Sequence, residues 1–296
     1  MDKRALRMTQ PEGDTPQERL AALAGRMEMF KTGELELPAK TNFVNNHIHT
    51  IYSFSPYSPV GAAYTAWSNG LTTAGIMDHD SVAGAEEFVQ AGQTIGIATT
   101  VGFECRCKMD KTPFAGRRIN NPDQNSVAYV ACHGIPHQNI DKAQAWLAPY
   151  REERNLRNRK MVERINELLS GSGVAIDFDK DVVPLSQNAT GGSITERHIS
   201  YALAFAIVAT VGKGQPVVDF MKDKLDVSVQ GKALAVLQNA QDGAYEYNLL
   251  GVSKAHLVSR VYIDDDAERS AGAEYLAVVK EIGWCSASAS LGDGGG

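Results

Sequence analysis

The sequence predicts an α/β protein whose strands and helices alternate as parallel β/α units, in a barrel or in an open sheet. Between residues 41 and 140, short apolar segments suited to buried strands alternate with helical patterns. This alternation favours parallel strands, because each parallel connection needs a crossover, which is usually a helix. From residue 141 to residue 250 the pattern is helical alone. We therefore expect a β/α domain that is interrupted by an all-helical insertion.

The N-terminal segment predicts a loose arm followed by one helix. Residues 1–15 are polar and contain Pro11 and Gly13, a composition typical of an unpaired chain terminus. Thr15 is a candidate N-cap, and from there apolar side chains recur at helical spacing as far as Phe30. The sequence therefore predicts an amphipathic helix before the first strand.

The first part of the sheet follows in a regular order. The expected elements are a short strand at residues 43–44, a helix over 59–71 closed by Gly70, a strand over 72–80, a helix over 81–96, a strand over 97–107 and a further strand over 125–135. Several of these strands end on polar residues. Those ends are where a β/α fold places its functional groups.

The insertion is expected to begin with a helix over 141–170 that Pro149 interrupts. Ser193 and Glu196 have the spacing of a capping box, which predicts a second helix with His198 in its first turns. The small-residue end of the chain, SASASLGDGGG, is more typical of a linker or a broken chain end than of a strand.

Composition and charge exclude several classes of protein. An apolar fraction of 43% and a charged fraction of 22% are typical of a soluble globular chain. A net charge of -6 argues against a protein that coats nucleic acid through a basic surface, so no stable nucleic-acid partner is expected. The four cysteines do not form a disulfide framework, and the sequence contains no signal peptide and no membrane-spanning run. We expect a cytoplasmic protein that does not bind membranes.

Candidate metal ligands gather at the carboxyl ends of the predicted strands. His47 and His49 have H-x-H spacing, which directs both imidazoles to one side of an extended segment. Imidazole and carboxylate groups together suit zinc, manganese or iron. The other residues at these ends are Asp78, His79, Asp80, Glu104 and His133. Their recurrence at successive strand ends predicts a metal site.

Structural interpretations of the same residues remain open. An H-x-H pair arises readily by chance, and a lone histidine is more often a hydrogen-bonded residue than a ligand. Charged residues at 78–80 favour a metal site, because a charge buried after an apolar strand is costly unless it is paired or binds an ion. Cys105 and Cys107 could hold a soft metal, but small buried residues of a strand are the simpler interpretation.

Basic residues offer two further hypotheses. Arg117 and Arg118 lie in a predicted loop, where one of them is expected to bind a phosphate through its guanidinium group, with solvated side chains as the alternative. Arginines also recur between Arg151 and Arg164, a pattern that would suit a nucleic-acid face. Glutamates are interleaved with them, which favours a salt-bridged helix surface instead.

Five segments, HIHT, GIMDHDSVAGAEEF, GFE, ACHG and ERHISYAL, occur in this order between residues 42 and 205. Together they resemble the motifs of the polymerase and histidinol phosphatase (PHP) family. The resemblance implies a distorted (β/α)7 TIM-like barrel with two or three divalent metal ions, zinc, manganese or iron, at the strand ends. It also implies hydrolysis of a phosphate mono- or diester by a metal-activated water. The implied partner is a small phosphorylated substrate, such as a nucleotide or a short oligonucleotide.

The resemblance assigns a metal role to most of the candidate residues. By position they are His47 and His49 for one ion, Glu104 as a bridge, His133 and His198 for a second ion, and His79 for a third, with Asp78 and Asp80 as ligands or as carboxylates that orient His79. The implied domains are an N-terminal arm and helix over 1–40, the first part of the barrel over 41–140, the helical insertion over 141–250, and a return to the barrel over 251–296, incomplete at the C-terminus.

Two departures from the family pattern keep other functions open. Phe54 and Ser55 stand where the family carries a His or Asp, and the closing D-x-H motif is absent, since His256 is the sole histidine after His198. A catalytically impaired scaffold or binding module is therefore one alternative. A metal-dependent amidohydrolase is another, although that class normally needs a carbamylated lysine or a late aspartate base.

Overall fold

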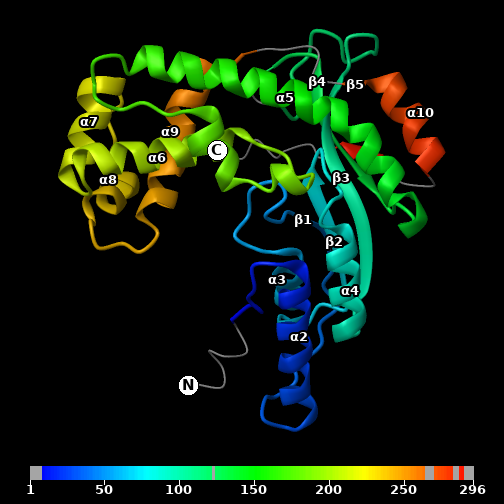
Figure 1. Cartoon of the computed structure of the whole chain (residues 1–296). Coiled ribbons are helices and arrows are strands. Elements are labelled where there is room, and N and C mark those ends of the chain that lie inside the picture. Colours follow the sequence, from blue (N-terminus) through cyan, green and yellow to red (C-terminus); the bar gives the residue numbers. More distant parts are fainter. Residues whose placement is uncertain (1–8, 122–123, 264–269, 283–286, 290–296) are drawn as a thin grey trace. The chain divides into compact units, whose positions relative to one another are not determined.

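The computed structural model describes residues 9–121, 124–263, 270–282 and 287–289 (Figure 1). The chain divides into two compact units. Unit 1 comprises Met1–Tyr150, Asn188–Ser193 and Ala267–Gly296, and unit 2 comprises Arg151–Gln187 and Ile194–Asp266. The start of the predicted N-terminal arm and most of the predicted linker-like end lie outside the described residues.

Unit 1 is a curled mixed sheet with helices packed against it (Figure 1). Its elements are α2 (Pro16–Lys31), β1 (Asn45–Ile48), α3 (Pro59–Ser68), β2 (Thr73–His79), α4 (Ala85–Ile95), β3 (Ala98–Lys108), β4 (Val127–His133), the start of α5 (Ile140–Leu168), β5 (Ser270–Ala271), α10 (Gly272–Ile282) and β6 (Ala287–Ala289). The strand order is β1-β2-β3-β4-β6, and β5 pairs with β3. The fold is therefore a mixed α/β partial barrel. The described strands do not form the complete (β/α)7 barrel that the resemblance implies.

The prediction of parallel strands is confirmed for the first three strands of the sheet and not for those that follow. β1, β2 and β3 are parallel, whereas β4 is antiparallel to β3, and β6 is antiparallel to β4. The described residues between Met109 and Ser126 form turns and no helix. Without a helical crossover the chain returns along β3 as a hairpin, and so the prediction of a further parallel strand is wrong. The expectation of a linker at the C-terminal end is also wrong at β6.

Local signals explain where the helices of unit 1 begin and end. The Ser58 side chain accepts a hydrogen bond from the Gly61 N–H, and Pro59 occupies the first turn, so α3 starts where the sequence predicts. α4 ends at Gly96, whose φ of 75° is the left-handed conformation that glycine adopts without strain. The first strand lies two residues later than expected, because Phe43 and Val44 are exposed and pairing starts at Asn45.

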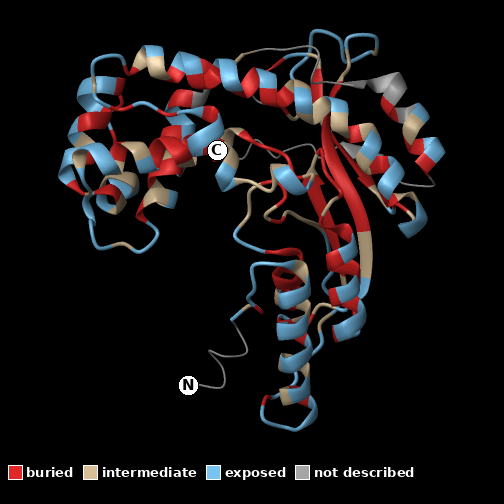
Figure 2. Cartoon of the chain, in the orientation of Figure 1, coloured by how far each residue is buried: buried red, intermediate tan, exposed pale blue. Residues whose placement is uncertain are grey.

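The sheet has an outer face covered by helices and an inner face that carries polar groups. Alternate residues of β3, among them Phe103 and Cys105, belong to the apolar core beneath the helices, and Figure 2 shows these strands buried. The Sγ atoms of Cys105 and Cys107 lie 3.7 Å apart. This contact is the main reason why the pKa of the Cys105 thiol is raised well above its usual value, and burial of the thiol adds to the effect. A thiol held protonated in the core agrees with the structural interpretation of the C-x-C pair.

The inner face leaves room only for glycine at two points. A Cβ atom on Gly102 would lie 2.3 Å from the Cys132 carbonyl oxygen, and one on Gly75 would lie 2.2 Å from the Thr100 Oγ1 atom. Real Cβ atoms do not approach other heavy atoms this closely, so any side chain there would displace a neighbouring strand. These glycines keep the interior of the partial barrel narrow next to the polar cluster.

Unit 2 is helical and has its own core. It contains the rest of α5, short turns η2 (Phe178–Val182) and η3 (Val183–Leu185), α6 (Glu196–Val211), α7 (Gln215–Leu225), α8 (Gly231–Gln238) and α9 (Tyr245–Val261). The predicted interruption at Pro149 is wrong, since α5 runs through it and tolerates the missing backbone donor.

Within the described residues no single helix is long and apolar enough to cross a bilayer, although α6 and α7, bent by 111°, pass that test as a pair.

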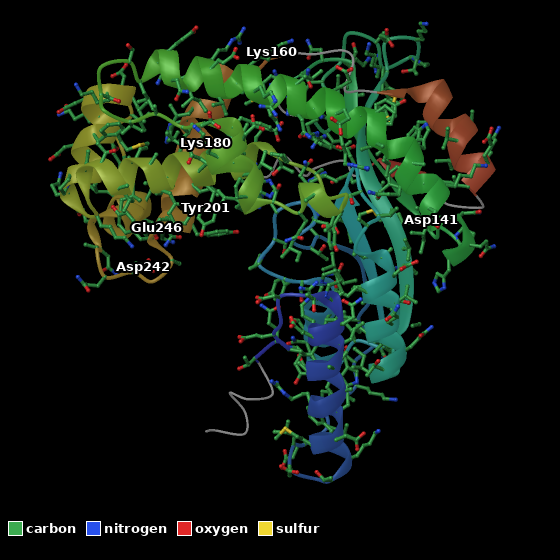
Figure 3. All side chains as sticks on the ribbon, in the orientation of Figure 1. Asp141, Lys160, Lys180, Tyr201, Asp242 and Glu246 are labelled. Atoms are coloured by element: carbon green, nitrogen blue, oxygen red, sulfur yellow. The ribbon has the colours of Figure 1, made fainter. Side chains whose placement is uncertain are left out.

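The arginines of α5 divide into buried and exposed sets. Arg157 is fully buried and forms an ion pair with Glu196, while the more exposed Arg159 pairs with Asp179. Figure 3 shows the exposed Lys160 projecting from the same helix. These ion pairs join α5 to other segments of unit 2. The absence of a nucleic-acid face on α5 stays a prediction. The carboxylates that pair with Arg157 and Arg159 lie outside α5 and are not the glutamates interleaved with its arginines.

Candidate metal centre

The H-x-H pair lies on and just after β1. Ile48 pairs with Ile76 of β2 and packs against the core of unit 1, so the alternation of the strand turns His47 and His49 to the inner face. Their rings meet edge to face with centroids 5.1 Å apart. The sequence prediction that both imidazoles share one side is therefore confirmed.

Glu104 lies at the centre of the polar cluster, on the inner face of β3. It pairs with His79 at the end of β2 in the parallel register. The Glu104 Oε2 atom is 3.2 Å from the His79 Nδ1 atom, 3.8 Å from the His47 Nε2 atom and 3.9 Å from the His49 Nε2 atom. Burial raises the pKa of Glu104, but the nearby imidazoles of His47, His79 and His49 outweigh it and leave that pKa lowered. The group is thus a carboxylate at neutral pH.

Three side chains fit a metal ion by their donor atoms. The ligand atoms of His47, His49 and Glu104 all lie within 4.8 Å of one another. Two imidazole nitrogens and one carboxylate oxygen are a donor set that zinc, manganese and iron accept. Bond lengths of about 2.0–2.3 Å would draw these atoms closer together than they lie here. The residues present therefore fit a divalent ion.

Two further histidines border this group. The His79 ring stacks on His49 with centroids 4.6 Å apart, and the His133 ring lies 6.3 Å from that of His47. His133 reaches the cluster although β4 is antiparallel, because the register places it opposite Gly102, two residues from Glu104 on the same face. Burial and the neighbouring His47 lower the pKa of His133, so it is neutral at pH 7. A neutral imidazole is the form that binds metals.

Tyr129 was missed by the sequence analysis. It lies two positions from Ala131 and four from His133 on β4, and its ring centroid is 5.9 Å from that of His79. The period of two along a strand, applied backwards from His133, would have identified it. It forms part of the wall of the cluster on the side of β4.

Asp78 does not join the group of candidate ligands. In the register it pairs with Phe103, whereas His79 pairs with Glu104, so the two neighbours face opposite sides of the sheet. The Asp78 carboxylate accepts hydrogen bonds from the Thr50 N–H, the Thr50 hydroxyl and the Ser53 hydroxyl. Burial raises its pKa to about 6, against the opposing effect of these hydrogen bonds. It organises the loop after His49 and does not orient His79.

Asp80 and the segment Asn188–Ser193 hold the loops around the cluster. The Asp80 N–H donates to the Glu104 carbonyl, with φ of 49° at Asp80, a conformation that aspartate tolerates. The Ser193 N–H donates to the Tyr52 carbonyl, three residues beyond His49. The predicted capping box of Ser193 and Glu196 is wrong, because Thr195 is the N-cap of α6 and forms the capping box with His198. The segment thus ties the loop after β1 to the rest of unit 1.

The predicted phosphate ligands Arg117 and Arg118 lie in the turns between β3 and β4. Both are exposed, and neither forms an ion pair with a described residue. The Arg118 backbone forms an isolated bridge with Asn125. The structure does not place either side chain in the cluster, so phosphate binding by one of them stays a prediction.

His198 lies in unit 2, where it acts as a capping residue. Its Nδ1 atom accepts a hydrogen bond of 2.9 Å from the Thr195 N–H. A neutral imidazole that accepts at Nδ1 carries its proton on Nε2, and in that form it has no free lone pair for an ion. Its role as a metal ligand therefore stays a prediction that would require a change of tautomer.

We expect unit 2 to lose stability as the pH falls, because His198 resists protonation. Burial lowers its pKa from 6.5 to about 4. His198 is therefore protonated at a lower pH in the folded state than in the unfolded state. The stabilisation is present above pH 6.5 and is lost as the pH falls towards 4, by about 3 kcal/mol at most. Urea unfolding at about pH 7.5 and about pH 4.5 should show a larger loss for the wild type than for His198→Gln. Exposed His256→Gln is the control, and equal losses in all three proteins would contradict the prediction.

Comparison with known proteins supports this fold. No family model and no curated protein matches the sequence. Among solved structures, the chain is similar to a "putative metal-dependent phosphoesterase" from Bifidobacterium adolescentis, with a TM-score of 0.52, 21% identity and coverage of 86% of this chain and 68% of that one. An amidohydrolase from Chromobacterium violaceum has a TM-score of 0.42 and 20% identity, and the match covers 67% of this chain and 64% of that one. The chain thus shares its α/β fold with the first of these structures, as the PHP resemblance of the sequence implies.

Proposed function

We propose that this chain is a metal-dependent hydrolase that cleaves a phosphate mono- or diester. The observation that carries the proposal is the position of Glu104, whose carboxylate lies between the imidazoles of His47, His49 and His79. Divalent ions bound there would supply an activated water and neutralise charge on the substrate. The PHP resemblance supports phosphoester cleavage, and the fold shared with the structure described as a "putative metal-dependent phosphoesterase" agrees with it.

The roles of the protein groups follow from their donors. His47, His49 and Glu104 would hold the first ion, and His133 would contribute to a second with Glu104 as the shared ligand. Neither water activation nor attack on phosphorus then needs a side-chain nucleophile. Arg117 or Arg118, exposed in the turns between β3 and β4, would bind the substrate phosphate through a bidentate guanidinium contact. The substrate we favour is a nucleotide or another small phosphorylated molecule.

The proposal is tested by metal content and by substrate class together. Elemental analysis of the purified protein, after incubation with manganese or zinc, should show at least one bound ion per chain. With manganese added, we expect phosphate release from nucleotides or from histidinol phosphate, and no cleavage of amide substrates. Metal uptake with no hydrolysis of any phosphoester would instead support the impaired scaffold. Cleavage of amides alone would indicate an amidohydrolase and overturn the proposal.

A further inference from the structure

The imidazole of His49 can bind an ion at Nε2 only in one of its two neutral forms. The lone pair of Nε2 is available when the ring proton is on Nδ1, and it is blocked when the proton is on Nε2. The Nε2 atom is the one that lies 3.9 Å from the Glu104 Oε2 atom. Whatever holds the proton on Nδ1 therefore prepares His49 for the ion.

A buried chain of hydrogen bonds lies behind the Nδ1 atom of His49. Ser53 Oγ is 3.3 Å from His49 Nδ1 and donates to the Asp78 Oδ1 atom over 2.6 Å. Asp78 is 1% exposed and Ser53 is 2% exposed, so water does not compete for these contacts. The two residues come from different segments, the loop after β1 and the strand β2, and Asp78 is fixed further by two hydrogen bonds from Thr50.

The protons in this chain can be assigned from the donors. The Asp78 carboxylate has no proton of its own when ionised, so the single proton between it and Ser53 comes from the Ser53 hydroxyl. Ser53 then presents only lone pairs to His49, and the contact between them requires a proton on Nδ1. The order of donation runs from His49 to Ser53 and from Ser53 to Asp78. It leaves the Nε2 lone pair directed to the side of Glu104.

We propose that Ser53 and Asp78 are positioning residues that fix His49 in its Nδ1–H form and thereby prepare its Nε2 atom to bind a metal ion. This inference rests on the proposed function in one respect, namely that His49 is a metal ligand. Ligating histidines commonly donate their second N–H to a carboxylate or another acceptor, which fixes the tautomer and the orientation of the ring. Here a serine relays that contact to a carboxylate on the opposite face of the sheet.

The tautomer is measured directly in the metal-free protein. Long-range ¹H–¹⁵N NMR correlation spectra should show His49 of the wild type with its proton on Nδ1. In Ser53→Ala we expect a shift towards the Nε2–H form, and Ser53→Thr, which keeps the hydroxyl, should restore the wild-type pattern. Ser55→Ala removes a hydroxyl from the same loop that does not contact Asp78, so it is the matched control. An unchanged His49 spectrum in folded Ser53→Ala would overturn the proposal.

Metal affinity separates this inference from the proposed function. Titration with manganese should show binding weaker by about 10–100-fold in Ser53→Ala, the range found for residues that support a ligand, and near-normal binding in Ser53→Thr and Ser55→Ala. If the wild type itself binds no metal, the proposed function fails, while the tautomer result still decides the role of Ser53. If the wild type binds and Ser53→Ala binds equally well, the positioning role alone is refuted. Circular dichroism identifies a variant that fails to fold, and Asp78→Asn then provides the second test, with the same two measurements expected to change.

Discussion

Replacement of Glu104 by glutamine should remove measurable metal binding and hydrolysis together. Glutamine keeps the shape of the side chain but carries no charge, and its amide cannot bridge two cations as a carboxylate does. Three imidazoles lie around the Glu104 carboxylate, the nearest at 3.2 Å, and Glu104 supplies the carboxylate of the candidate metal group found among the described residues. We expect manganese affinity to fall by more than about 100-fold, beyond the loss caused by changing a residue that only supports a ligand.

The matched control for this change is Glu86→Gln. Glu86 is exposed in the first turn of α4, so the same substitution there removes one charge from unit 1 without touching the cluster. Isothermal titration with manganese and phosphate release should leave this control close to the wild type. Full metal content and activity in Glu104→Gln would exclude the central role of this carboxylate. Loss of activity with normal metal content would restrict Glu104 to catalysis.

The centre of the site could be predicted because it depends on local periodicity. The H-x-H spacing places the side chains of His47 and His49 on the same side of the strand. Where strands are parallel, a polar residue at the end of an apolar strand indicates a position in the functional site. The same rule, applied to neighbours, separates His79 from Asp78, since adjacent residues of a strand face opposite sides. Grouping both as ligands or as partners of each other overlooked this alternation. Asp78 contacts the loop after β1 instead.

The remaining features depend on contacts between segments that are distant in the sequence. β4 runs antiparallel to β3, and the periodicity within each strand does not specify the direction in which strands pair, so Tyr129 was missed as well. Ser53 stands out only when β2 brings Asp78 beside it. The N-cap of α6 is Thr195 and not Ser193, whose backbone N–H contacts the distant Tyr52 carbonyl. Such tertiary contacts override local propensity.

Substitution of Arg19 by methionine should strongly lower the stability of unit 1. Arg19 of α2 binds Glu87 of α4 through two hydrogen bonds of 2.7 and 2.8 Å, and both side chains are buried. Its remaining nitrogen donates to the Gly13 and Asp14 carbonyls, which holds the chain before α2. Without Arg19, the buried Glu87 carboxylate keeps the hydrogen bond from the Val60 N–H but has lost its charged partner, and loss of one partner of a buried ion pair costs about 3–5 kcal/mol. We expect a loss of that size in the free energy of unfolding.

Two comparisons show whether the loss arises from the buried charge. Lys31 and Glu28 form a pair on the same helix, but their side chains are 68% and 64% exposed, so Lys31→Met should cost less than about 1 kcal/mol. The double variant Arg19→Met with Glu87→Leu should be more stable than Arg19→Met alone, because no charge then remains buried without its partner. Urea unfolding followed by tryptophan fluorescence suits this test, since Trp67 contacts Phe30 of α2 with ring centroids 4.9 Å apart. A double variant as unstable as Arg19→Met would show that packing, and not the unpaired carboxylate of Glu87, accounts for the loss.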